Sequence, residues 1–292
     1  MKMQITFKDW VKSGSPFIWL NAGAVAISII MVLGLVGFIA SKGLVHFWPA
    51  AIVQANYTLP GNASVKIVGQ VTDSEMVKAE QLEAIGLKTP NGAPEAQRLL
   101  LKVGNRDVYG GDFRWVLDHH LTEKSYPQKA VVIERREWGN FYGYLEEVFE
   151  GSTLVTDANL DDNQSWQEFQ SRIERALTIH DNIMDIQKGD IGSINYQIER
   201  LRLEERRLEL NDELSETEVA RLQFERDELN AEYEAHQKKL SILYQDLERD
   251  HFTAIEMGGQ IIEIKMSQVV RAFRPNAMGT GQKVSHYFSK LG

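Results

Sequence analysis

The most prominent pattern in the chain is one uninterrupted apolar run near its N-terminus. Residues 17–40 read FIWLNAGAVAISIIMVLGLVGFIA and contain no charged side chain. As an α-helix this run would be roughly 36 Å long, and the hydrocarbon core of a bilayer is about 30 Å thick. A secretory signal peptide has a shorter apolar run, of about 7 to 15 residues, before its cleavage site. The pattern therefore predicts an uncleaved transmembrane helix over residues 17–40, with lipid bilayer around it.

The basic residues around this helix predict its orientation. Lysines precede it, and Lys42 is the only basic residue close behind it. Because positive charge is retained on the cytoplasmic side of a membrane, we expect residues 1–16 to be cytoplasmic and the bulk of the chain to be periplasmic. This predicts a protein of the bacterial inner membrane that crosses the bilayer once. Phe47 and Trp48 would lie at the outer interface, where aromatic side chains gather.

Beyond the apolar run, short β-branched and aromatic stretches alternate with Gly, Pro and Asn turns. Such alternation is typical of antiparallel strands joined by turns. We predict a mostly antiparallel β-rich domain over residues 45–160. Residues 73–85 have a weaker helical pattern, and residues 95–101 fit either a strand or a helix. The clearest strands are residues 65–71, 99–103, 129–135 and 141–150.

Residues 164–250 predict a helical hairpin. The segment is rich in Glu, Arg, Leu and Gln and contains no proline, which is typical of long helices. Two arms meet near residues 211–215, where Ser215 and Glu218 fit a capping box for the second arm. Apolar and polar seam positions on that arm alternate at spacings of three and four, the pattern of a coiled coil. They are Val219, Leu222, Arg226, Leu229, Tyr233, His236, Leu240, Leu243 and Leu247.

The same pattern predicts the pairing of the two arms. If they fold back antiparallel around residue 213 or 214, the numbers of facing residues add up to about 427, and Glu205 comes close to Arg226. Six of the nine seam positions predicted on the first arm are aliphatic or Met. These nine are His180, Met184, Gln187, Ile191, Ile194, Ile198, Leu201, Glu205 and Leu208.

Two irregularities stand out in the first arm. Gly189 and Gly192 fall off its seam, so we expect the arm to break or bend near them. Residues 162–177 predict a separate amphipathic stretch before the hairpin proper, with one apolar side. The buried side chains of that stretch would be Trp166, Phe169 and Ile173.

After the hairpin the chain returns to strand chemistry. Residues 251–275 contain two β-like runs around Gly258 and Gly259, which predict a β-hairpin. The helical hairpin is then an insertion between strands that return to the same sheet. Residues 276–292 form a linker that ends in an amphipathic stretch directed towards the membrane. The predicted fold class is a membrane-anchored α+β protein with an N-terminal transmembrane helix, an antiparallel β domain and an inserted coiled-coil hairpin.

Composition narrows the function classes. The chain has 292 residues, with 41 acidic and 32 basic side chains and a formal net charge of -9. No tract is basic enough to follow a phosphate backbone, so we expect no nucleic-acid partner. The absence of cysteine excludes disulfides and thiolate ligands or nucleophiles within the chain.

The sequence contains few candidates for chemistry. His119 and His120 are adjacent, so their side chains point in different directions and do not easily close on one metal ion. Arg114 and Trp115, near Tyr109, suggest an arginine stacked on an aromatic ring. We found no Ser/His/Asp set, no paired carboxylates in an apolar context and no Gly-rich phosphate loop. We therefore predict that the chain is not an enzyme and has no catalytic, cofactor-binding or metal-binding residue. His46, beside Phe47 and Trp48, is expected to be an interfacial polar residue.

Two segments carry a family resemblance. SGSPFIWLNAGAVAISIIMVLGLVGFIASKGLVHFWP, residues 13–49, and VVRAFRPNAMG, residues 269–279, resemble the N-terminal part of the phosphate ABC transporter permease of gamma-proteobacteria. That permease is the second of the importer's two membrane subunits. The resemblance implies a first membrane helix followed by a large periplasmic insertion. It also implies partners: the other permease subunit, the ATPase subunit and the periplasmic phosphate-binding protein.

The chain departs from the family pattern at its C-terminus. It ends at Gly292, before a second membrane helix, so the helices that form the translocation pathway and the cytoplasmic coupling loop are absent. We therefore expect a truncated or split permease, and no transport residue is carried over to this sequence. The alternative is a periplasmic adaptor of an efflux or secretion system, which also combines one anchor, β domains and an inserted helical hairpin.

Overall fold

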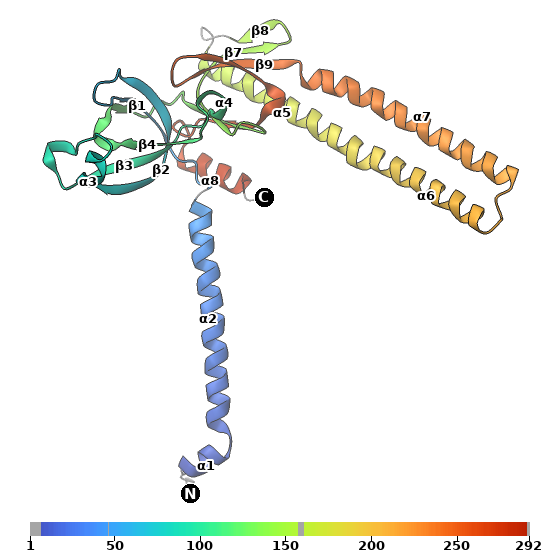
Figure 1. Ribbon diagram of the computed structural model, residues 1–292, viewed down its shortest axis with the longest axis horizontal. Coiled ribbons are helices and arrows are strands. Elements are labelled where there is room, and N and C mark those ends of the chain that lie inside the picture. Colours follow the sequence, from blue (N-terminus) through green and yellow to red (C-terminus); the bar gives the residue numbers. More distant parts are fainter. Residues whose placement is uncertain (1–6, 46, 157–160, 291–292) are drawn as a thin grey trace. The chain divides into compact units, whose positions relative to one another are not determined.

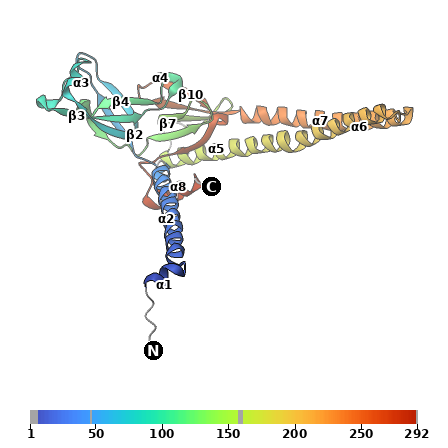
Figure 2. The same ribbon diagram turned by 60° about the horizontal axis from the view of Figure 1, so that its bottom comes forward.

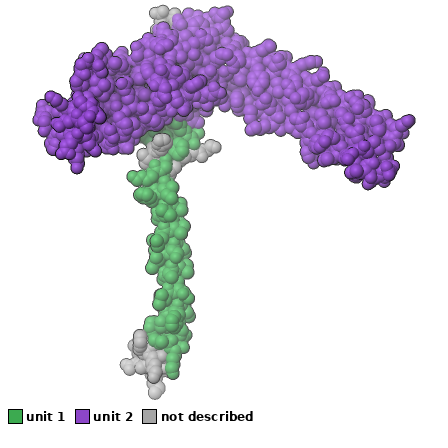
Figure 3. All heavy atoms as spheres, in the orientation of Figure 1, with its two compact units in different colours: residues 1–49, 278–292 green, residues 50–277 purple. Residues whose placement is uncertain are grey.

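The computed structural model describes residues 7–45, 47–156 and 161–290. The chain forms two compact units (Figure 3). The first contains residues 1–49 and 278–292, and the second contains residues 50–277.

The first unit is helical. A short helix, α1 (Phe7–Lys12), is followed by Gly14, whose φ of 75° turns the chain into α2 (Ser15–Val45). Within α2 the candidate span is Ser15–Gly43, which contains an 18-residue window with a mean hydropathy of 2.6, and none of that window is buried. Among the described residues, this is the one helix with the length and composition of a membrane span, which a signal sequence can also have. The unit also contains α8 (Thr280–Ser289).

The second unit begins with a five-stranded antiparallel sheet in the order β4-β3-β2-β1-β5. The short elements α3 (Ala79–Glu83), η1 (Pro90–Gly92), α4 (Arg106–Tyr109) and η2 (Asp118–His120) connect its strands or extend them. The strands are β1 (Ile52–Tyr57), β2 (Val65–Lys78), β3 (Glu95–Lys102), β4 (Phe113–Leu117) and β5 (Leu121–Ser125).

The helical interpretation of residues 73–85 was wrong for more than half of that segment. Strand β2 continues to Lys78, and buried Val77 lies opposite buried Ala96 of β3. A β-branched residue that is buried between paired strands favours the extended conformation over a weak helical pattern. The ambiguous residues 95–101 are a strand for the same reason: they have partners on both sides.

A second antiparallel sheet has the order β10-β9-β7-β6-β11, with β8 paired to β7. The β-rich segment of residues 45–160 thus contributes to two sheets, and residues 250–273 complete the second one. A 3₁₀ turn, η4 (Met266–Gln268), separates its last two strands. The strands are β6 (Val131–Arg135), β7 (Asn140–Glu150), β8 (Thr153–Thr156), β9 (Asp250–Glu256), β10 (Ile261–Lys265) and β11 (Val269–Phe273).

The helices leave and re-enter this second sheet. The helices follow β8 in the chain, and β9 follows the helices. Both β8 and β9 pair with β7 (Figures 1 and 2). The predicted β-hairpin around Gly258 and Gly259 is present, because β9 and β10 pair across it. Its second run does not continue as one strand, since β11 instead pairs with β6 on the opposite edge.

The core of the second sheet lies under helix α5 (Asp162–Asp185). Phe169 is fully buried and meets Phe252 of β9 edge-on, with ring centroids 4.8 Å apart. Trp166 packs 5.6 Å from Phe169 and receives the guanidinium of Arg274 on its face at 4.3 Å. The predicted apolar side of this helix is therefore in the core. It is not a separate stretch, however, because α5 continues unbroken to Asp185.

Polar side chains join the two sheets. Asn105 is fully buried and has a left-handed φ of 53°. Its side-chain amide forms hydrogen bonds with the backbone of Tyr142, as a neighbouring strand would. Its Nδ2 donates to the Tyr142 carbonyl and its Oδ1 accepts from the Tyr142 N–H, both at 3.0 Å. Tyr142 in turn donates its hydroxyl to Gln70 Oε1 of β2 at 2.9 Å. Each of these buried polar groups therefore has a partner, as burial requires.

Candidate partner-binding surface

The projecting part of the second unit is a pair of antiparallel helices. Helix α5 passes through a π-helical turn, η3 (Ile186–Asp190), into α6 (Ile191–Leu210), and α7 (Glu216–Leu247) returns alongside it (Figures 1 and 2). The chain reverses over residues 211–215, where Asp212 has a φ of 57°. The predicted position of the turn is confirmed. The coiled-coil interpretation of this hairpin remains a prediction.

The tip is closed by a cap and a leucine cluster. Ser215 is the N-cap of α7, and its hydroxyl accepts a hydrogen bond from the Glu218 N–H at 3.2 Å. The Glu218 carboxylate instead binds Arg221 Nε at 3.0 Å, so only half of the predicted capping box forms among the hydrogen bonds described for these residues. Behind the cap, four leucines of the two arms and one of the turn pack together. They are Leu201, Leu208, Leu214, Leu222 and Leu229.

Ion pairs between the arms define their pairing. Arg221 Nη2 lies 2.6 Å from Glu204 Oε1, and Arg226 Nη2 donates to Glu205 Oε2 at 2.7 Å. Farther from the tip, His236 Nδ1 lies 3.3 Å from Asp190 Oδ2. The numbers of these pairs add up to between 425 and 431, around the value of about 427 predicted from the seam. The contact predicted between Glu205 and Arg226 is present.

The buried seam of the first arm is shifted by one residue from its predicted positions in the part of the arm that precedes Gly189 and Gly192. Ile183 and Ile186 are buried there, whereas the predicted Gln187 is exposed and Met184 is only half-buried. The π-helical turn explains the shift, because it holds one more residue per turn and rotates everything before it relative to α6. His180 is half-buried and buried Ile179 takes its expected place. The irregularity expected near Gly189 is thus this turn. At the other end of the seam, Val219 is 43 % exposed.

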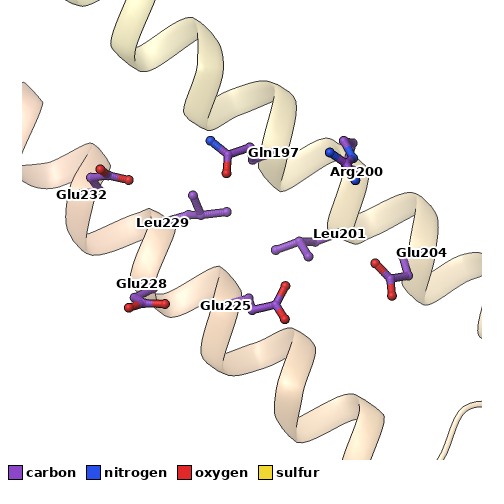
Figure 4. Close-up of a pocket in the computed structure, with 8 residues that line it drawn as sticks. All are labelled: Gln197, Arg200, Leu201, Glu204, Glu225, Glu228, Leu229 and Glu232. Atoms are coloured by element: carbon purple, nitrogen blue, oxygen red, sulfur yellow. The ribbon is translucent and has the colours of Figure 1, made fainter.

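A groove lies between the arms near the tip (Figure 4). It has a volume of about 630 Å³, and Leu201 and Leu229 point towards one another across its floor. Four of its eight lining residues are glutamates and one is an arginine, so the groove carries negative charge. Such a lining favours cationic side chains and disfavours free phosphate. The lining residues are Gln197, Arg200, Leu201, Glu204, Glu225, Glu228, Leu229 and Glu232.

Apolar side chains also lie on the outer faces of both arms. Tyr196, Leu203 and Leu210 follow one another at intervals of seven on α6, with exposed fractions of 67 %, 56 % and 69 %. A spacing of seven keeps residues on one face of a helix. On α7, Phe224 and Ile242 are likewise exposed. We call these five residues the outer apolar rows. Rows of this kind on a helix are typical of surfaces that pack against another helix.

The residues considered as candidates for chemistry pack against other side chains of the fold. The rings of His119 and His120 meet edge-on at 4.3 Å, and burial, followed by the neighbouring His119, lowers the pKa of His120. Among the described residues, no group of three His, Asp or Glu side chains could hold a metal ion. Arg114 does stack on an aromatic ring, but on Tyr57 at 5.5 Å, while Arg98 covers Trp115 at 4.4 Å. His46 lies outside the described residues.

Comparison with known proteins adds no relative: no family model, no curated protein and no solved structure matches this chain. The outer apolar rows and the acidic groove therefore have to be interpreted from their own chemistry. Neither feature was found by the sequence analysis, which used only the seam. A signal was present nevertheless, since Tyr196, Leu203 and Leu210 repeat every seven residues outside the seam positions.

Proposed function

We propose that the chain is the membrane-anchored periplasmic portion of an inorganic phosphate ABC importer permease. In this proposal α2 holds the protein in the bacterial inner membrane, with residues 1–16 in the cytoplasm and the second unit in the periplasm. The hairpin is the surface that contacts the periplasmic phosphate-binding protein or the other permease subunit. The ATPase subunit would join from the cytoplasmic side.

The observation that carries the anchoring is the exposure of α2. No residue of its apolar window is buried by the rest of the chain, and its large aliphatic side chains are more than half exposed. In water, an exposed apolar surface of this size would cost far more than a soluble helix can offset, whereas lipid solvates it without cost. The family resemblance of residues 13–49 and 269–279 supports the assignment to phosphate import.

The hairpin is proposed as the partner-binding part because its apolar rows have no cover. Leu203 and Phe224 lie at the same level of the two arms, since their numbers also add up to about 427, and both are more than half exposed. Helices that present a second apolar row beside their own packing seam can add a further helix. The acidic groove next to them supplies charge that selects a basic partner.

A paired deletion tests the role of the hairpin in import. Residues 197–203 and 224–230 are removed together from the complete importer, which shortens each arm by one heptad, about 10 Å, and preserves the pairing of the arms. We expect phosphate uptake, or the affinity for the binding protein, to fall at least several-fold. Unchanged uptake and unchanged affinity would reject the proposed role. The variant Tyr196→Gln keeps the arm length and removes one residue of the outer apolar rows, so a fall in affinity there would assign the contact to the rows themselves.

An efflux or secretion adaptor is the second candidate. It is favoured by the insertion of the hairpin between β8 and β9, which both pair with β7 of one sheet, and by the apolar rows on the outer faces of the hairpin. A photo-crosslinking amino acid at position 203 or 224 discriminates the two functions. Crosslinks to importer subunits support the permease, and crosslinks to an outer-membrane channel support the adaptor. The seam position 222, where Leu222 is buried and does not line the groove, serves as the control.

A further inference from the structure

Trp48 lies close to the end of the proposed membrane span. Helix α2 ends at Val45, and Trp48 follows within three residues, with 41 % of its surface exposed. Three residues of extended chain reach about 10 Å at most. If α2 crosses the bilayer, Trp48 is therefore held at the level of the outer lipid headgroups. This is the depth that tryptophan prefers in membranes.

A second aromatic residue, from the far end of the sequence, lies against Trp48. The ring centroid of Tyr287 is 6.0 Å from that of Trp48, and the two planes make an angle of 52°. Tyr287 belongs to α8, and its ring also meets that of Phe288 at 5.6 Å. The contact between Trp48 and Tyr287 thus sets the level of α8 as well, within the same compact unit.

Helix α8 has the side chains of a helix that lies in a membrane interface. Val284 and Phe288, four residues apart and on one face, are 38 % and 64 % exposed, whereas His286 on the other side is buried. A capping hydrogen bond from the Gly279 N–H to Gln282 Oε1, at 2.9 Å, fixes its N-terminus. Short helices with one apolar face and a polar face bind at the boundary of headgroups and acyl chains.

The charge of this unit also fits a lipid surface. The chain as a whole has a net charge of -9, yet residues 10–49 and 278–290 contain no acidic residue. Lys42 lies near the end of α2, and Lys283 and Lys290, seven residues apart, lie on one side of α8. Lysines at this level attract the phosphates of lipid headgroups, and more strongly when the lipids are anionic.

We propose that α8 lies along the headgroup region of the outer leaflet, with Val284 and Phe288 turned into the lipid. Its occupant is the phospholipid surface itself, and Phe47, Trp48 and Tyr287 form the aromatic belt at that level. The inference rests on the proposed membrane anchoring of α2. It makes α8 a second membrane contact, which fixes the periplasmic end of the anchor at a defined depth.

The absence of cysteine allows a direct test. Single variants Phe288→Cys, Ser289→Cys and Leu33→Cys of the full chain carry an environment-sensitive dye in vesicles that contain anionic phospholipid and brominated lipid. Ser289 is exposed and lies one position from Phe288, about 100° around the helix, so it is a matched control. We expect a blue-shifted dye at position 288, quenched at least threefold more strongly than at 289.

The outcomes separate this inference from the anchoring. Strong quenching at Leu33 with equal, water-like signals at 288 and 289 would overturn the placement of α8 while leaving the anchor intact. Weak quenching at Leu33 would overturn both, because α2 would then not be in the bilayer. Quenching at 288 that disappears in vesicles without anionic lipid would assign the contact to the lysines as well as to Phe288.

Discussion

Arg135 binds Asp107 through both of its terminal nitrogens, each 2.8 Å from a different carboxylate oxygen. The Arg135 side chain is 1 % exposed and that of Asp107 is 25 % exposed. Arg135 also donates to the carbonyls of Gly139 and Trp138, so its guanidinium is held from several sides. Because Asp107 lies in α4, between β3 and β4, and Arg135 ends β6, this pair joins the two sheets.

Replacement of Asp107 by Asn is expected to destabilise the second unit by about 3 kcal/mol. The variant leaves a buried guanidinium without its counter-charge, which costs more than the loss of an ordinary hydrogen bond. Unfolding of the full chain in detergent, followed by tryptophan fluorescence in urea, measures the effect. Glu75→Gln is the matched control, because Glu75 pairs with Arg98 on the surface and should cost less than about 1 kcal/mol. Equal losses in the two variants would contradict a special role for the buried pair.

The same pair predicts a dependence on pH. The hydrogen bond from Arg135 lowers the pKa of the Asp107 carboxyl below its ordinary value of 3.8. A carboxyl with a lowered folded-state pKa stabilises the protein fully above its unfolded pKa, and this contribution is lost as the pH falls through the folded value. The difference in unfolding free energy between the native chain and Asp107→Asn should therefore be constant above about pH 5 and shrink below about pH 4. A constant difference at acidic pH would contradict this origin of the stability.

The cap of α7 is expected to stabilise the hairpin tip. Ser215→Ala removes the acceptor for the Glu218 N–H, which costs about 1 kcal/mol. Hydrogen exchange of the amides of residues 216–222 should accelerate about fivefold, since these are the first turns of the helix. Ser241→Ala, at an exposed position within α7, is the control and should leave these amides unchanged. Unchanged exchange in Ser215→Ala would mean that the cap does not hold the tip.

The elements with a local cause could be predicted from the sequence. The turn of the hairpin, the Ser215 cap and the pairing of Glu205 with Arg226 all follow from spacings within a few turns of the same arms. The return of the chain to the sheet that it left could also be predicted. It follows from the strand-like runs before and after the helices, and β7 and β9 do pair.

The features that depend on distant partners could not be predicted in this way. Nothing local assigns β11 to β6, since these strands are more than 130 residues apart. The left-handed Asn105 is explained only by its contact with Tyr142, on the other sheet. The outer apolar rows of the hairpin do not follow from the pairing of the arms, because their residues lie outside the seam that holds the two helices together.

The π-helical turn η3 allows a test of how the two arms of the hairpin keep their buried faces aligned. Buried residues on the first arm occur at positions 179, 183 and 186, and the series resumes at 191 and 194. The interval of five between 186 and 191 contains one residue more than a continuous heptad allows, and η3 accommodates it. Gly189 within this turn is exposed, and a methyl group built at its position contacts nothing within 4 Å. It is thus the natural residue to remove.

Deletion of Gly189 should convert η3 into continuous α-helix and keep both buried faces aligned. We expect the free energy of unfolding to change by less than about 1 kcal/mol, because removal of a helical glycine gains at most about that much in helix propensity. Deletion of Ala231, an exposed residue of uninterrupted α7, rotates Leu240 and Leu247 by about 100° relative to Leu222 and should cost about 3 kcal/mol or more. Urea unfolding followed by helical circular dichroism compares the two deletions. If both deletions lowered the free energy of unfolding by similar amounts, the hairpin would need η3 for its packing. A turn that only accommodates one extra residue would tolerate the loss of Gly189.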